Sequence, residues 1–169
     1  MIGPGKTIIE QKDKINNYIK ENNTFVITIN NPELYKADAV FYSNNKRYNE
    51  FQNNTKKTNI KILTSNIKSI NEDSTIIFDY SKSLSRKDGI SDLSLLMMLR
   101  ILEQLNINKV VLAGFDGFSI KDENFYDSNV EYILDKNYVK DLNNQIRNSI
   151  NCFKEKMDIV TLTPSINID

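Results

Sequence analysis

Short apolar runs alternate with helical patterns along this chain of 169 residues. Runs rich in β-branched residues predict buried strands, and they lie at residues 25–29, 39–42, 60–64, 75–78, 109–113 and 159–163. Apolar residues at helical spacing predict helices at residues 7–22, 48–53, 93–105 and 139–157. This alternation predicts an α/β fold with a mostly parallel sheet, organised as a single domain over residues 1–169.

The start of the chain predicts a strand that is cut short. Met1 and Ile2 resemble the end of a strand, because the turn at residues 3–5 should follow a complete one. We expect either an unusually short first strand or a domain excised from a longer protein. Thr7 and Glu10 match the spacing of a capping box, which predicts that the first helix begins at Thr7.

Charge and cysteine content exclude several partners. Lys plus Arg and Asp plus Glu both number 22, so no overall field attracts nucleic acid or an anionic membrane. We find no signal peptide and no apolar run long enough to span a bilayer. The single cysteine, Cys152, cannot form an internal disulfide; we expect it to be buried and the protein to be cytoplasmic. Whether the chain forms a homo-oligomer is left open.

The chain contains no histidine. This excludes a Ser-His-Asp triad, a Cys-His pair and any metal site that needs imidazole. No Asp-x-Asp pair is present either, which argues against a metal-dependent glycosyltransferase built on that pair. We assign no metal-ligating residues. Catalytic residues remain unknown at this stage. Asp116 and Asp88 are the two candidates for a base, should the chain catalyse a reaction.

Four of the five glycines fall in two turns, at Gly3 and Gly5 and at Gly114 and Gly117. Glycine lets a ligand or another backbone approach the main chain closely. In open α/β sheets, ligands bind where strands end, at a topological switch point. We therefore expect both turns to line one binding cleft, with their peptide NH groups directed inward.

The first turn leads into a helix and predicts an anion site. The amides of Gly3, Gly5, Lys6 and Thr7 would face a phosphate or carboxylate at the helix start. Gly5-Lys6-Thr7 also matches the end of a P-loop, but the first glycine of that motif would precede the chain. The alternative is a tight turn with an ordinary capping box.

Small polar residues recur where the predicted strands end, and parallel strands share that edge. The candidate ligand-binding side chains are Asn30, Asn31, Ser43, Asn44, Ser65 and Asn66. Together they suit a nucleotide base, a ribose or a sugar, although each is also an ordinary turn former. In the second turn, Gly114 and Asp116 are further candidate ligand-binding residues. Three interpretations of the Asp116 carboxylate are open: ligand binding, base catalysis or capping of loop amides. The polar segment 122–136 is expected to cover the cleft as a flap.

Four motifs in a fixed order carry a family resemblance. They are residues 3–8, 26–31, 88–91 and 110–118. This order resembles the C-terminal Rossmann-like domain of aldolase-like proteins found with surface-polysaccharide genes. There a TIM barrel of the 4-hydroxy-2-oxovalerate aldolase or HMG-CoA-lyase type precedes it. The resemblance implies a three-layer Rossmann-like fold and an aldolase barrel as partner in a parent chain, with no aldolase activity in this chain alone.

The same order is distantly similar to small bacterial sialyltransferases and pterin diphosphokinase-like proteins. In the sialyltransferases the matching loops hold a CMP-sugar, which carries the binding role to Gly3, Gly5, Asn30 and Ser91. The family's base is a histidine, which is absent here, and the Ser-Gly order is altered in Gly89-Ile90-Ser91. This comparison favours binding of a nucleotide or sugar nucleotide over sialyl transfer.

Three hypotheses follow for function. The first is an accessory domain that binds a nucleotide, nucleotide-sugar or related phosphorylated ligand in bacterial surface polysaccharide biosynthesis. The second is a glycosyltransferase-like transferase that uses Asp116 or Asp88 as its base. The third is a non-catalytic assembly domain of the aldolase.

Overall fold

The computed structural model describes residues 1–30, 35–53, 60–68, 74–84, 92–120, 124–126 and 135–168. The helices among them are α1 (Thr7–Glu10), α2 (Lys12–Asn22), α3 (Asn45–Phe51), α4 (Tyr80–Ser83), α5 (Ser94–Gln104) and α6 (Lys136–Lys154). The strands are β1 (Ile27–Ile29), β2 (Ala39–Tyr42), β3 (Ile60–Thr64), β4 (Thr75–Phe78), β5 (Lys109–Leu112) and β6 (Asp158–Thr161). Each predicted strand is therefore present, and β1 is shorter than expected.

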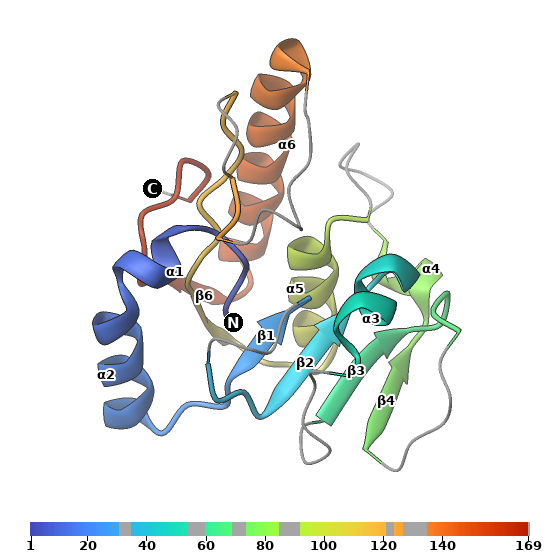
Figure 1. The fold of residues 1–169 in the computed structure, drawn as a ribbon. Coiled ribbons are helices and arrows are strands. Elements are labelled where there is room, and N and C mark those ends of the chain that lie inside the picture. The colour runs from blue at the N-terminus through green and yellow to red at the C-terminus, as the bar shows by residue number, and fades with distance from the viewer. Residues whose placement is uncertain are drawn as a thin grey trace.

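The sheet is parallel and is joined through the first residues of the chain (Figure 1). Strands β1, β2, β3 and β4 pair in that order, and β5 pairs with β6. Ile2 forms parallel bridges with both Thr28 and Ala113. Residues 1–3 thus form a very short strand between β1 and β5, which confirms the strand end predicted there.

This order creates a topological switch point beside residues 1–3. From this short strand the chain builds β1 to β4 on one side, then crosses to β5 and β6 on the other. Loops leaving the two strands next to the reversal diverge, which leaves a crevice at their carboxyl ends. The two glycine turns follow these two neighbouring strands.

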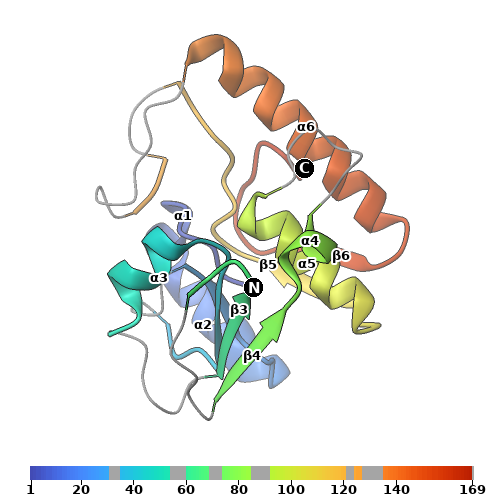
Figure 2. The same cartoon turned by 90° about the vertical axis from the view of Figure 1, so that its right-hand side faces the viewer.

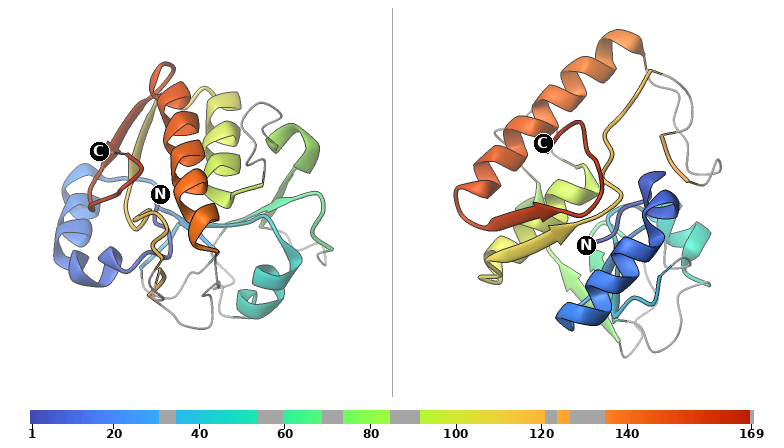
Figure 3. Two further views of the ribbon diagram at one scale, coloured as in Figure 1. Left: turned by 90° about the horizontal axis from the view of Figure 1, so that it is seen from above. Right: turned by 90° about the vertical axis from the view of Figure 1, so that its left-hand side faces the viewer.

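Helices cover both faces of the sheet, which gives a single three-layer Rossmann-like α/β domain (Figure 2). Side chains of β2 alternate between the layers, as strand geometry requires. Phe41 belongs to the core formed with α5 and α6, whereas Val40 and Tyr42 pack with α3. Viewed from above, α6 lies beside α5 (Figure 3). The apolar helix α5 is buried along most of its length, as its sequence predicts.

Three local predictions were wrong. The helix expected over residues 7–22 is divided into α1 and α2 at Gln11, and Lys6 rather than Thr7 occupies its N-cap. The predicted capping box is not formed, because the Thr7 hydroxyl donates to Asp116 instead. Cys152 is exposed. It follows Ile150 by two residues, which places it off the apolar stripe of α6.

Among the helices that the structure describes, none combines the length and apolar character needed to cross a membrane.

Candidate functional site

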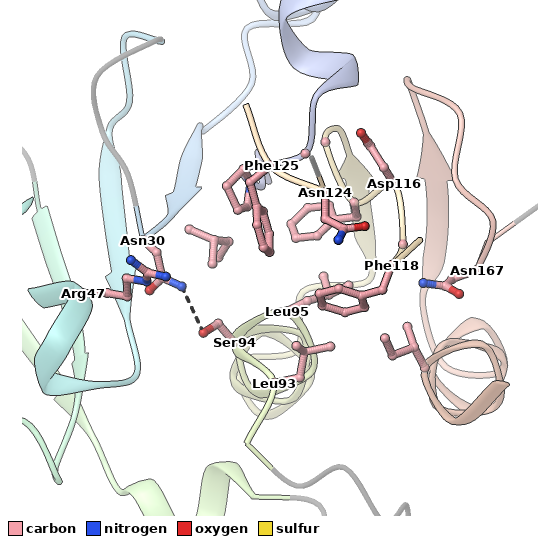
Figure 4. Close-up of a pocket in the computed structure, with 17 residues that line it drawn as sticks. Asn30, Arg47, Leu93, Ser94, Leu95, Asp116, Phe118, Asn124, Phe125 and Asn167 are labelled. Carbon is pink, nitrogen blue, oxygen red and sulfur yellow. Dashed lines mark hydrogen bonds between the residues drawn. The ribbon is translucent and has the colours of Figure 1, made fainter. Parts of the chain in front are cut away.

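Both glycine turns line one cavity of about 110 Å³ at the carboxyl ends of the central strands (Figure 4). Pro4 and Gly5 contribute from the first turn, and Gly114, Asp116 and Gly117 from the second. The prediction that the two turns share a pocket is therefore confirmed in its geometry. Gly3 lies behind the lining, where its amide donates to the carbonyl of Ala113 at 2.8 Å.

One wall of the cavity is aromatic. Phe115, Phe118 and Phe125 line it, and the rings of Phe118 and Phe125 meet edge to face with centroids 6.1 Å apart. Phe125 is brought there by a bridge to Gly5, and the amide of Tyr126 donates to the carbonyl of Pro4 at 3.0 Å. Residues 124–126 thus lie against the first turn. Of the flap predicted at 122–136, residues 122–123 and 127–134 lie outside the described residues.

The opposite wall is polar and is centred on Asn30, which has a left-handed φ of 61° at the end of β1. The side-chain nitrogen of Asn30 donates to the Ser94 hydroxyl at 3.3 Å, and the Ser94 hydroxyl in turn contacts the Ser43 hydroxyl at 2.6 Å. The Oδ1 atom of Asn30 is buried and accepts no hydrogen bond from the described residues. A buried acceptor without a donor is costly and suggests that a ligand supplies one.

Arg47 lies beside Asn30 on this wall (Figure 4). It is only 3% exposed, and its Nη1 atom contacts Glu50 Oε2 at 2.7 Å. Its position is set by Asn44, which caps α3 and accepts a hydrogen bond from the Arg47 amide at 2.9 Å. Burying an arginine costs free energy unless its charge is paired, and here the carboxylate of Glu50 supplies a partner.

Asn167 completes the far side of the cavity. Its side chain is 3% exposed, and its Oδ1 atom also has no hydrogen-bond partner among the described residues. Asn124 also lines the cavity and accepts a hydrogen bond from the Ser119 amide at 2.6 Å. The cavity therefore has a buried acceptor at each end and an aromatic wall between them.

The amides of the first glycine turn are used within the protein. Gly5 donates to the carbonyl of Gly114 at 2.9 Å, and Thr7 donates its amide to Asp116 Oδ2 at 2.9 Å. The Thr7 hydroxyl donates to Asp116 Oδ1 at 2.5 Å. The expectation that these NH groups face a ligand was wrong, because the carboxylate of Asp116 occupies the place predicted for an external anion.

Close packing of the two turns explains their glycines. A Cβ atom on Gly3 or on Gly5 would lie 2.6 Å from the carbonyl oxygen of Gly114. No side chain fits such an approach. The first turn therefore matches the tight turn of the alternative, whereas the capping box is replaced by a cap from Asp116 in the second turn.

The contacts of Asp116 fit a helix cap better than a catalytic base. Burial raises the pKa of its carboxyl group, while the hydrogen bonds from Thr7 act in the opposite direction and the pKa stays above its ordinary value. Both carboxylate oxygens accept hydrogen bonds from Thr7. Of the three interpretations open from the sequence, this geometry accounts for the capping of loop amides.

The other predicted residues are distributed differently. Ser65 accepts a hydrogen bond from the Tyr80 amide at 3.0 Å, and Asn66 donates to the carbonyl of Ser43 at 3.0 Å. These contacts tie the strand ends together outside the cavity. Lys6 forms the N-cap of α1. Three predicted residues lie outside the described residues: Asn31, Asp88 and Ser91.

Sequence reasoning missed Arg47, Ser94 and Asn167. Asn44 after a strand is a strong helix cap and places Arg47 in the first turn of the next helix, but it does not place that turn at the cavity. Ser94 opens the predicted apolar helix, but its link to Asn30 spans 64 residues. No local pattern marks Asn167.

Comparison with family models, curated proteins and solved structures gave no match to this chain. Within the part of the chain that the structure describes, no group of three or more metal-ligating side chains is assembled. The site is defined by its own geometry as a small, mainly apolar pocket with a few buried polar groups at the switch point of a Rossmann-like domain.

Proposed function

We propose that this cavity binds a nucleotide, a nucleotide-sugar or a related phosphorylated ligand. One observation carries the proposal: a cavity at the switch point combines aromatic rings with the buried, unpartnered oxygens of Asn30 and Asn167. Aromatic faces suit a planar ring, and the two acceptors suit amino or hydroxyl groups that donate. Open α/β sheets bind ligands at this place in the fold.

The size of the cavity limits what lies inside it. Its volume of about 110 Å³ is below the roughly 300–1,000 Å³ of sites that enclose a whole drug-sized ligand. One base or one sugar ring is therefore the part we expect to be enclosed. The part of the ligand beyond this ring and the phosphate next to it would lie at the open side.

The biological setting we propose rests on the motif resemblance. We infer an accessory domain of an aldolase-like protein in bacterial surface polysaccharide biosynthesis, with the aldolase barrel as its partner. Binding a phosphorylated sugar derivative would fit a domain attached to an enzyme of glycan synthesis.

The test is the melting temperature of the chain with CMP, CDP, UDP and ATP. A ligand at a hundred times its Kd stabilises by about 2.7 kcal/mol, which corresponds to a rise of roughly 5–10 °C for a domain of this size. Leu93→Trp fills the cavity and should remove the rise. Leu105→Trp is the matched control, because Leu105 is exposed at the other end of the same helix.

The alternatives predict other results in the same experiment. Absence of any rise with the four nucleotides would contradict the proposal and favour an assembly domain. Turnover of a CMP- or UDP-sugar by the isolated chain would support a transferase. A rise that Leu93→Trp leaves intact would place binding elsewhere on the molecule.

A further inference from the structure

A phosphorylated ligand needs an anion site, and the first glycine turn does not provide it. Its amides are satisfied by Asp116 and by the neighbouring turn. A phosphate at that position would be repelled by the charge of Asp116 and would find no free amide. The positive charge for a phosphate therefore has to come from another part of the lining.

Arg47 is the one lysine or arginine among the described residues that line the cavity. It comes from α3, and Figure 4 shows it next to Asn30 and across the cavity from Phe118 and Asn167. The guanidinium is buried, whereas its partner Glu50 is 36% exposed. The pair thus joins a fixed, enclosed cation to a carboxylate that borders on solvent.

We propose that Arg47 is the anion-recognition residue of this cavity and binds a phosphate of the ligand, while Glu50 holds the guanidinium in place until the ligand arrives. This rests on the proposed function, since it assigns the phosphate of the same ligand. A planar guanidinium binds phosphate with two parallel hydrogen bonds. Glu50 can turn into water at little cost because it lies at the surface.

The neighbouring groups fit this assignment. Ser94 is the first residue of α5, an eleven-residue helix whose N-terminus carries partial positive charge toward the same wall. The buried Oδ1 atom of Asn30 needs a donor, and a sugar hydroxyl next to the phosphate supplies one. Phosphate, hydroxyl and ring are thereby distributed over Arg47, Asn30 and the phenylalanines.

The experiment compares nucleosides with their monophosphates by calorimetry: cytidine with CMP, uridine with UMP, and adenosine with AMP. In the wild-type chain we expect at least one monophosphate to bind about tenfold or more tightly than its nucleoside, the range of a hydrogen-bonded charge. Arg47→Met should reduce that ratio to about one. Lys46→Met is the matched control, because Lys46 is the exposed neighbour in the same helix.

The outcomes separate the two proposals. If Arg47→Met keeps the wild-type ratio, or if Lys46→Met lowers it equally, the role of Arg47 is wrong and the nucleotide pocket stands. If none of the six compounds binds the wild-type chain, the nucleotide pocket itself is wrong. Should Arg47→Met fail to fold, Glu50→Gln decides, because glutamine keeps an oxygen that accepts a hydrogen bond from Arg47 and removes the competing charge. The ratio should then rise severalfold, and an unchanged or lower ratio overturns the assignment.

Discussion

The two ends of the same sheet carry two different cavities. The carboxyl-end cavity between the glycine turns measures about 110 Å³ and holds Asn30, Arg47 and Asn167. The amino-end groove, lined by residues 1–2, α2 and the starts of β1 and β5, measures about 450 Å³ and is mainly apolar. By volume alone, the amino-end groove would be the preferred site.

Buried polar atoms favour the smaller cavity. Among the described residues, four buried side-chain atoms lack a hydrogen-bond partner, and two of them, in Asn30 and Asn167, line the carboxyl-end cavity. None of the four lines the amino-end groove. A protein tolerates such atoms where function requires them, so unmet hydrogen-bonding capacity is a better guide to a ligand site here than volume.

The largest effect that we predict belongs to the amino end. The Met1 amine is buried beside the groove and donates to the carbonyl of Val111 at 2.6 Å. Burial lowers the pKa of this amine from 8.0 to about 5. The unfolded chain therefore binds more protons between these values, and stability rises with pH across that window. For a chain with a free amine, the rise should be about 4 kcal/mol.

Urea unfolding at pH 5, 6.5 and 8 measures this effect. A chain acetylated at Met1 is the control, because the acetyl group keeps an N–H donor and removes the charge. If the free and acetylated chains change in parallel with pH, the amine does not titrate as a buried group and the packing at this end is looser than described.

The second prediction compares two glycines at the carboxyl end. Gly114 has a φ of 71°, and a Cβ there would lie 2.6 Å from the backbone oxygen of Gly3. Gly117 has a φ of 93°, and its Cβ would meet mainly the side chain of Ile166. Both substitutions strain the backbone. The Ile166 side chain beside Gly117 can move aside, whereas the backbone of Gly3 beside Gly114 cannot. Gly114→Ala should cost about 3 kcal/mol or more, and Gly117→Ala about 1–2 kcal/mol.

Urea unfolding of the two variants measures the difference, and equal costs would mean that the two turns do not pack as closely as their backbone contacts indicate. Ligand binding by Gly117→Ala gives a further readout, since Gly117 lines the cavity and Ile166 does not. A variant that stays folded and loses nucleotide binding would favour the carboxyl end as the site.

The sequence predicted the sheet well because its strands are short, β-branched and separated by turn residues. Residues 39–42, 60–64 and 75–78 form strands as expected. It also predicted that the two glycine turns meet. It missed the cap on Thr7, because the partner, Asp116, lies 109 residues further along the chain. Thr7 with Glu10 forms a credible local motif, and a tertiary contact replaced it.

The same limit applies to the cavity wall. Asn30 was predicted from its place after a strand, and it does line the cavity. Arg47 sits in a segment whose sequence predicts only a turn and a helix start. The chemistry of such a residue becomes visible when the fold brings α3 beside the end of β1, which local patterns do not specify.

The third prediction tests whether Asp116 is a cap. A double-mutant cycle with Thr7→Val and Asp116→Asn should give a coupling free energy of about 1–2 kcal/mol, since Thr7→Val removes the hydroxyl donor and Asp116→Asn removes the negative charge that strengthens this hydrogen bond. Urea unfolding of the four chains measures it. Coupling near zero would mean that Asp116 acts independently of Thr7 and would reopen its assignment as a ligand contact.

The pH dependence of this pair has a definite sign. Because burial raises the pKa of Asp116 above 3.8, the folded protein binds the proton more tightly than the unfolded chain does. This contribution is present at low pH and is lost as the pH rises through the folded-state pKa. The stability of the wild type relative to Asp116→Asn should therefore decrease as the pH rises above 3.8, and an increase would contradict a buried carboxyl group.

The smallest predicted effect decides between the two ends for ligand binding. Phe25 lines the amino-end groove and is 60% exposed, so Phe25→Ser should change the free energy of unfolding by only about 0.5 kcal/mol. The rise in melting temperature with nucleotide should remain at the wild-type value, because the ring of the ligand lies at the other end of the sheet. Loss of that rise in a variant of unchanged stability would move the site to the larger groove, and volume would then have been the better guide.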